Sequence, residues 1–200
     1  MKIFTKEIAG LVMFVGTIQW LMMILILESY QPEYISAFHY VSTLGVGTTA
    51  FVYNISIGTF GLCVIAGSIL LLKSLKSKIF SVFLLLTGVF ILSLGYFPEN
   101  IRPIHGYVTA FTFIFAVISD IISFKVLKSP LSQISFIIGL ISLVVMIIFF
   151  PYFGLPAEAT TTFLGLGKGT MERILIYLLI VWMLIFSISL LKTNERVKSI

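Results

Sequence analysis

Charged residues are scarce in this sequence of 200 amino acids, where 10% are Asp, Glu, Lys or Arg and 59% are hydrophobic. A soluble domain carries about 25% charged residues, so the composition excludes an ordinary water-soluble core. The mean hydropathy of +1.14 points the same way. We therefore predict an all-α, polytopic membrane protein whose residues 1–200 form one bundle.

Cysteine and histidine are also rare, with one and two copies. The single Cys63 excludes an intrachain disulfide and a cysteine-based metal centre. His39 and His105 cannot form a three-histidine site, so a centre combining both with Glu99 is the one metal site left open. The zinc-protease and serine-hydrolase motifs are missing, and the glycine-rich run at 165–170 lacks phosphate-loop spacing. We predict no metal and no cofactor.

Long apolar runs are what the chain has in abundance. About 20 apolar residues, at a rise of about 1.5 Å each, cross a hydrocarbon core of about 30 Å. Runs of this length occupy about 8–27, 51–72, 79–96, 105–124, 131–150 and 173–191. They lack the alternation of a membrane β-barrel, and only helices otherwise satisfy the backbone in lipid. The sequence therefore predicts a six-transmembrane-helix bundle that retains its first span.

Basic residues are distributed unequally between the two ends of the six predicted spans. Ten of the thirteen Lys and Arg residues lie at the chain ends and in the second and fourth connections: Lys2, Lys6, Lys73, Lys76, Lys78, Lys125, Lys128, Lys192, Arg196 and Lys198. Short basic loops stay in the cytoplasm, so we predict cytoplasmic termini, three outer loops and a multi-pass protein of the cell membrane. Topology and anionic lipids account for the net charge of +5, and we predict no nucleic-acid partner.

Two of the outer loops contain a Leu-Gly-x-Gly stretch ahead of a span. Gly45 and Gly47 belong to the first stretch, and Gly165 and Gly167 to the second. Glycines before a helix allow backbone amides to converge on an anion, which the helix dipole favours. The alternative is that they are merely flexible helix starts.

The short outer segment 97–105 brings several reactive groups together. It contains Glu99, Arg102 and His105. His105 is suited to general acid–base chemistry, with Glu99 orienting it, and Ser42 is a candidate nucleophile if folding brings it close. In the alternative interpretation, Glu99 pairs with Arg102 and staples the turn.

Further polar residues lie at the start of the sixth span, where Lys168, Glu172 and Arg173 follow one another. Glu172 suits a helix N-terminus, whereas Arg173 there needs a carboxylate, an anionic ligand or a position at the lipid headgroups. Asn54 should face the bundle and form an interhelical hydrogen bond. Asp120 is the only carboxylate well inside a span, and it either serves function or pairs with a nearby lysine.

Four motifs occur in a recognisable order: His39-Tyr-Val-Ser-Thr-Leu-Gly45, Tyr53-Asn-Ile-Ser56 with Gly61, Phe97-Pro-Glu99 with His105, and Gly-x-x-x-Glu-Arg173. Over nearly the whole chain, this order resembles the uncharacterised six-span prokaryotic membrane family called domain of unknown function 998. Thr43 departs from the pattern, since an acidic residue often follows the serine. The layout is also distantly similar to the eukaryotic Frag1/DRAM/Sfk1 family, and the composition is archaeal-like. The resemblance implies a fold but no reaction.

Our first hypothesis is a non-catalytic protein that binds an anionic lipid or small anion in an outer pocket. The residues expected to line it are Ser42, Gly45, Gly47, Asn54, Glu99, Arg102, His105, Lys168, Glu172 and Arg173. The second is a membrane-embedded hydrolase or transferase that uses His105, Glu99 and Ser42. The third is a small transporter built around Asp120, or an accessory subunit of a membrane complex. Membrane lipids are the expected partners, and a homo-oligomer stays open.

Overall fold

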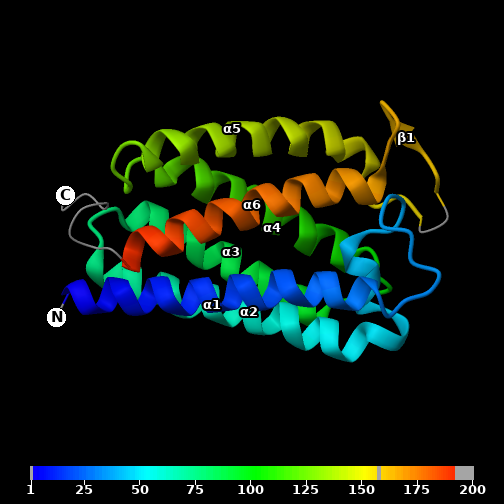
Figure 1. The fold of residues 1–200 in the computed structure, drawn as a ribbon, viewed down its shortest axis with the longest axis horizontal. Helices are drawn as coiled ribbons and strands as arrows, with labels where there is room; N and C mark the ends of the chain where they lie inside the picture. Colours follow the sequence, from blue (N-terminus) through cyan, green and yellow to red (C-terminus); the bar gives the residue numbers. More distant parts are fainter. Residues whose placement is uncertain (1, 157–158, 192–200) are drawn as a thin grey trace.

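The computed structural model describes residues 2–156 and 159–191, with side chains from residue 5 onwards. Its six α-helices are α1 (Lys2–Glu28), α2 (Ala50–Ser74), α3 (Lys78–Tyr96), α4 (Ile104–Ser123), α5 (Leu131–Phe149) and α6 (Lys168–Leu191) (Figure 1). All six are long and apolar enough to cross a membrane. The prediction of an all-α, six-span membrane protein is therefore confirmed.

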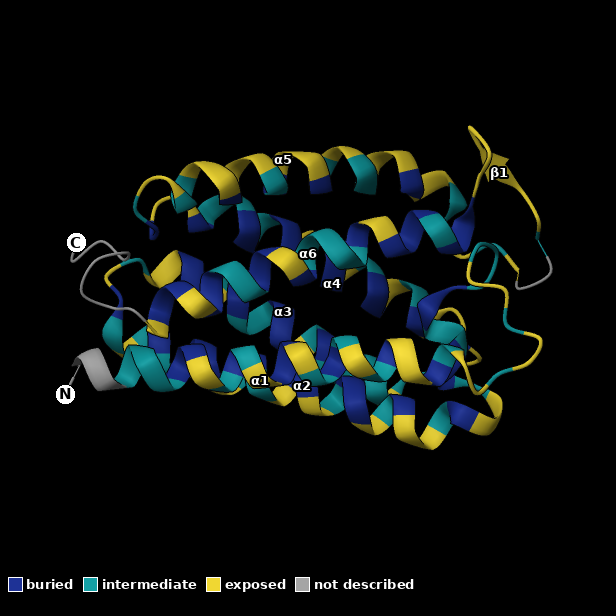
Figure 2. Cartoon of the chain, viewed as in Figure 1, coloured by how far each residue is buried: buried dark blue, intermediate teal, exposed yellow. Residues whose placement is uncertain are grey.

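The helices form a closed ring in sequence order. Each helix packs against the next one along the chain, and α6 closes the ring on α1, with further contacts between α4 and α6 across the interior. The short second, third and fourth connections force α2, α3, α4 and α5 to be antiparallel neighbours in this order. α5 is the least buried member, and its outward face is exposed along most of its length (Figure 2). In a membrane this face contacts lipid.

The two ends of the bundle differ in their connections. α1 begins and α6 ends at the same end (Figure 1), where the short second and fourth connections also lie. The opposite end, which we call the long-loop end, carries segments 29–49, 97–103 and 153–167. Lys192, Arg196, Lys198 and the side chain of Lys2 lie outside the described residues. The cytoplasmic location of the termini stays a prediction.

Glycines allow the closest approaches between helices. Gly61 of α2 lies against the backbone of Leu92 in α3, and Gly67 of α2 lies against the side chain of Met13 in α1. Without a hydrophobic force between helices in lipid, such close backbone packing supplies van der Waals contact. These positions explain why α2 packs extensively against both of its neighbours.

The long-loop end contains more regular structure than its composition indicates. The first loop includes the 3-10 turns η1 (Val41–Gly45) and η2 (Gly47–Thr49), and η3 (Phe150–Tyr152) follows α5. Strands β1 (Thr162–Phe163) and β2 (Leu166–Gly167) form a small antiparallel hairpin, with Leu164 and Gly165 at positive φ in its turn. α6 begins at Lys168, five residues before the predicted start at 173. The charged residues that made 168–172 resemble a loop are buried by partners from the first and third loops.

Candidate functional site

Arg173 fastens the first loop to α6. Its Nη2 and Nε atoms donate to Oε1 of Glu28 at 2.7 and 3.1 Å, and Nη2 also donates to the Tyr34 hydroxyl. Its Nη1 atom donates to the carbonyl oxygens of Ser36 at 2.6 Å, His39 at 2.9 Å and Gly169 at 2.9 Å. A guanidinium has five N–H donors, so protein acceptors already engage this cation fully. The carboxylate that Arg173 requires is Glu28.

The start of α6 is also occupied by the first loop. The Thr170 amide donates to the Ala37 carbonyl at 3.2 Å. At Gly169, an added Cβ would collide with the carbonyl oxygens of Ser36 and His39, so only glycine allows this approach. Backbone carbonyl oxygens of the first loop therefore occupy the position at the start of α6 where the sequence predicted an anion bound by converging amides. Lys168 is fully buried beneath them, with Nζ bonded to the Pro156 carbonyl and 5.2 Å from the Tyr40 ring centre.

Glu99 joins all three loops at this end. Its Oε1 atom accepts from Nη2 of Arg102 at 2.8 Å, and Oε2 accepts from the Thr43 hydroxyl at 2.6 Å. Nη1 of Arg102 continues to the Gly154 carbonyl at 2.7 Å. Glu99 therefore serves the stapling role that the sequence allowed, and it extends the staple to the first and third loops.

His105 lies in the first turn of α4 and is buried, with 8% of its surface exposed. Its Nδ1 atom lies 2.7 Å from the carbonyl oxygen of Phe97. A carbonyl only accepts, so Nδ1 carries a proton, and when the ring is neutral Nε2 is an acceptor. Nε2 lies 3.3 Å from the Thr109 hydroxyl, which also bonds the His105 carbonyl at 2.8 Å. The Phe97 carbonyl, rather than Glu99, thus holds Nδ1.

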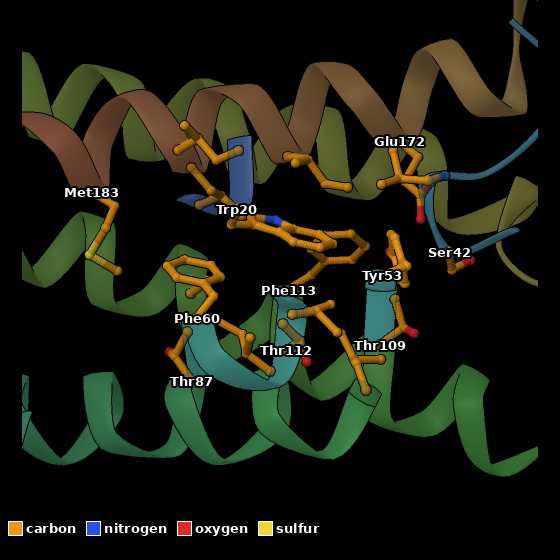
Figure 3. Close-up of a pocket in the computed structure, with 18 of the residues that line it drawn as sticks. Trp20, Ser42, Tyr53, Phe60, Thr87, Thr109, Thr112, Phe113, Glu172 and Met183 are labelled. Carbon is orange, nitrogen blue, oxygen red and sulfur yellow. The ribbon is translucent and has the colours of Figure 1, made fainter. Parts of the chain in front are cut away.

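A long apolar cavity, which we call the bundle cavity, lies inside the ring of helices. It encloses about 90 Å³ between α1, α2, α3, α4 and α6. Glu172 and Ser42 stand at one end and Met183 at the other, with Trp20 and Phe60 between them (Figure 3). Its lining on α6 runs from Glu172 to Met183, about 16 Å at a rise of about 1.5 Å per residue. The cavity thus has a polar end and an apolar depth.

A second cavity of about 380 Å³, the loop-end cavity, opens among the long loops. Its polar lining includes Glu99 and Arg102, and aromatic rings of Tyr40 and Phe149 complete the wall. Four residues line this cavity and the bundle cavity together: Ser42, Thr109, His105 and Glu172. We call these four residues the polar junction. Glu172 is held there because its Oε2 accepts from the Val41 amide at 2.5 Å.

Comparison with known proteins identifies the family of this chain. The profile of the family described as "Protein of unknown function (DUF998)" matches residues 14–189. The chain belongs to this family. The resemblance noted from its motifs is thereby confirmed over most of its length. No curated protein and no solved structure matches the chain significantly.

The residues predicted to line a pocket in this DUF998 protein fall into two groups. Ser42, Glu99, Arg102, His105 and Glu172 line one or both of the cavities described above. The other five, Gly45, Gly47, Asn54, Lys168 and Arg173, line neither cavity. Asn54 bonds the Gly45 carbonyl at 3.1 Å and so fixes the first loop to α2. Asn54, Lys168 and Arg173 in the second group hold the loops around the site.

Sequence reasoning missed several residues that the structure places at the cavities. Thr109 and Thr112 supply hydroxyls from α4, and Tyr53 and Trp20 supply rings from α2 and α1. Threonines in an apolar helix are commonly structural, since their hydroxyls bond the preceding turn. Thr112 does so, donating to the Val108 carbonyl at 2.8 Å. The available signal was the helical spacing of His105, Thr109 and Thr112 on one face of α4.

Asp120 lies apart from the site. It is fully buried, and neither of its carboxylate oxygens has a hydrogen-bond partner within the described part of the chain. The proposed route to water or to a pairing with Lys125 is therefore not realised, and Nζ of Lys125 instead lies 5.9 Å from the Phe124 ring centre. Asp120 lines neither cavity, and α4 runs unbroken past it. These findings give the transporter hypothesis no support.

The metal site left open by the sequence also lacks support. Among the described residues, no three His, Cys, Asp or Glu side chains are grouped so that they could hold a metal ion. Nδ1 of His39 accepts from the Ile35 amide at 2.8 Å, and its ring stacks on Tyr34. His39 therefore organises the first loop.

Two tyrosines of the first loop are locked in their protonated form. Burial raises the pKa of the Tyr34 and Tyr40 hydroxyls well above the ordinary value of about 10. The Tyr34 hydroxyl donates to the Tyr40 carbonyl at 2.9 Å, and the Tyr40 hydroxyl donates to the Tyr152 carbonyl at 2.5 Å. The Tyr34 bond therefore closes the first loop on itself, and the Tyr40 bond joins that loop to η3.

Proposed function

We propose that this protein binds a membrane lipid, with an apolar chain in the bundle cavity and a polar headgroup in the loop-end cavity. The observation that carries the proposal is the polar junction, Ser42, His105, Thr109 and Glu172, which separates an apolar cavity from a more polar one. A lipid likewise joins an apolar chain to a polar headgroup. Ligand sites are commonly apolar, with a few convergent polar groups that set orientation.

The apolar depth of the bundle cavity suits a hydrocarbon chain. Apolar cavities stay dry and accept apolar ligands, because water entering them loses its hydrogen bonds. Lining that extends about 16 Å along a helix covers about half of a hydrocarbon core of about 30 Å. Trp182 and Phe60 border it with buried aromatic surface. Contact with these rings would favour a flexible chain over water.

The polar junction favours a headgroup that donates hydrogen bonds. Glu172 and the Nε2 atom of His105 are acceptors, and Ser42 can donate or accept. Arg173 is occupied by Glu28 and backbone carbonyls, and Arg102 is bound to Glu99 and Gly154. We therefore propose a hydroxyl- or ammonium-bearing headgroup, in place of the anion that the arginines and Lys168 originally indicated.

The location of the headgroup follows from topology. The described lysines of the second and fourth connections, Lys73, Lys76, Lys78, Lys125 and Lys128, belong to the end opposite the long loops. If short basic segments stay in the cytoplasm, the headgroup cavity faces the outer leaflet of the cell membrane. Cysteine labelling from outside intact cells would check this orientation at Thr48, an exposed residue of the first loop.

Occupation of the bundle cavity can be measured by intrinsic fluorescence. Trp20 and Trp182 are the only tryptophans, both line the cavity, and they are 4% and 1% exposed. Bromine on a lipid chain quenches a tryptophan that it contacts. We expect saturable quenching when a lipid with a brominated chain is added to the protein in unbrominated detergent micelles. Ala116→Phe, which fills the cavity from α4, should weaken this binding at least about tenfold.

Ala66→Phe is the matched control, because Ala66 is exposed on the outer side of α2. It should leave quenching unchanged, and thermal unfolding should show that both variants fold. Equal quenching in Ala116→Phe and the unaltered protein would refute the proposal. A headgroup series should favour ethanolamine or free hydroxyls over phosphatidate, with Glu172→Gln reducing the preference. A preference for phosphatidate would contradict the proposed headgroup and would instead support the anionic ligand of our first hypothesis.

A second candidate function is acyl transfer at the same junction. The observation that favours it is that His105, whose Nδ1 is held by the Phe97 carbonyl, lines the same two cavities as Ser42. Ser42 would attack an acyl carbonyl while His105 takes the hydroxyl proton, and the leaving alcohol would receive that proton. Water or an acceptor alcohol, deprotonated by His105, would then take the acyl group from Ser42 and restore both residues.

This activity predicts turnover of a long-chain p-nitrophenyl ester by the purified protein. Ser42→Ala and His105→Gln should each reduce the rate at least about a hundredfold, as expected for a nucleophile and its base. Ser29→Ala, in an exposed part of the first loop, should retain it. No ester turnover, or equal rates in all four proteins, would exclude this candidate while leaving lipid binding intact.

A further inference from the structure

A third space, which is apolar and which we call the lateral groove, lies between α4 and α5 near the long-loop end. It has a volume of about 340 Å³ and is lined by Ala110, Phe113, Ile114, Met146, Ile147, Phe149, Phe150 and Phe153. Ile114, Ile147 and Phe150 are exposed, so the groove opens on the side of the bundle that faces lipid. Its position differs from the bundle cavity, which α5 does not line.

The lateral groove borders the loop-end cavity. Ala110, Phe149, Phe150 and Phe153 line both spaces. The loop-end cavity in turn meets the bundle cavity at the polar junction. The three spaces therefore lie in a series, with the loop-end cavity, which holds Glu99 and Arg102, between an apolar cavity inside the ring and an apolar groove outside it.

We infer that the ligand is a two-chain lipid that straddles α4, with one chain in the bundle cavity, the headgroup in the loop-end cavity and the second chain in the lateral groove. This inference rests on the proposed lipid binding and narrows its ligand class. A single-chain lipid with its chain in the bundle cavity would have no second chain to occupy the groove. A two-chain lipid matches the branched arrangement, because both of its chains depart from one headgroup.

The surroundings of the groove support a lipid chain as its occupant. The groove lies on two membrane-spanning helices and is walled by aliphatic and aromatic side chains. It also ends at the chamber that contains Glu99 and Arg102. A helix of another protein would fill the apolar part only, whereas a lipid chain joined to a headgroup fills both.

The test compares two brominated probes with the same headgroup and chain length, one with a single chain and one with two. The unaltered protein should bind the two-chain probe at least about tenfold more tightly, as measured by quenching of Trp20 and Trp182. The double variant Ile114→Phe/Met146→Phe fills the groove with residues that line neither other cavity. It should lower two-chain affinity to the single-chain level and leave single-chain affinity unchanged.

The control is Ile137→Phe/Ile141→Phe, which adds the same bulk to the exposed face of α5 away from the groove. It should behave as the unaltered protein. Equal affinity for the two probes in the unaltered protein would overturn the inference while leaving the proposed function intact. A groove variant that weakens both probes equally would also overturn it. Absence of quenching by either probe would refute the proposed function itself.

Discussion

Replacing Arg173 by alanine should destabilise the protein more than any other single loss of a side chain at the long-loop end. We expect a cost of about 3–5 kcal/mol, because the change removes one partner of a buried ion pair. The Arg173 and Glu28 side chains are only 9% and 22% exposed. The loss would also strip donors from the carbonyls of Ser36 and His39. Without them the first loop would separate from α6.

The measurement is the unfolding midpoint in detergent, followed by Trp fluorescence or by denaturation with SDS. Arg173→Lys should recover little, because an ammonium cannot reproduce the planar set of donors. Lys125→Ala is the matched control, since this cation is exposed and contacts only the Phe124 ring among the described interactions. It should change stability by about 0.5 kcal/mol or less. An Arg173→Ala midpoint equal to that of Lys125→Ala would contradict the structure.

The expected loss has a functional consequence. Glu172 and Val41 bring the first loop to the polar junction through their hydrogen bond, and Arg173 anchors the same loop one residue further along α6. Loosening the loop should therefore reduce lipid binding indirectly. Such an indirect effect can be told from the loss of a ligand contact. Arg173→Ala should weaken the binding of lipids of every headgroup class alike, whereas Glu172→Gln should change the preference among headgroups.

Adding one methyl group at Gly61 should also have a large effect. A Cβ there would lie 2.7 Å from Cα of Leu92 and 2.9 Å from its Cβ, and backbone cannot move aside as a flexible side chain can. We expect Gly61→Ala to destabilise the protein by about 1–3 kcal/mol, the usual cost of overpacking. The change would push α2 away from α3.

Gly58 provides an internal control on the same helix. A Cβ there would lie 3.7 Å from Cδ1 of the same Leu92, an ordinary contact. Because alanine is also favoured over glycine in a helix interior, Gly58→Ala should be neutral or stabilising. Thermal unfolding of the two variants side by side provides the comparison. If Gly61→Ala were as stable as Gly58→Ala, the close packing of α2 on α3 would be wrong.

Local features of the chain were sufficient to predict six membrane-spanning helices. Long apolar runs identified all six helices, because each satisfies its own backbone hydrogen bonds and needs no information from the rest of the chain. The staple between Glu99 and Arg102 was predictable for the same reason, since its partners are three residues apart. The start of α6 was misplaced at 173 because Lys168 and Glu172 are buried charges, which local composition assigns to a loop.

The candidate site depended on contacts between distant segments. Arg173 was expected to need an anion, but nothing in its neighbourhood could identify Glu28, which lies 145 positions away. Likewise, the polar junction combines Ser42 of the first loop, His105 and Thr109 of α4, and Glu172 of α6. Helical periodicity places residues on a face, yet it does not say which faces meet.

The sequence by itself thus determined the six spans, the unequal distribution of basic residues and the gathering of polar residues in the long loops. Only the tertiary structure decided which of those residues hold the loops, as Arg173 and Lys168 do, and which line cavities, as His105 and Glu172 do. The physical reason is that insertion in lipid depends on hydrophobicity summed along one segment. A cavity depends on where packing between segments leaves space, and that is a property of the whole ring of helices.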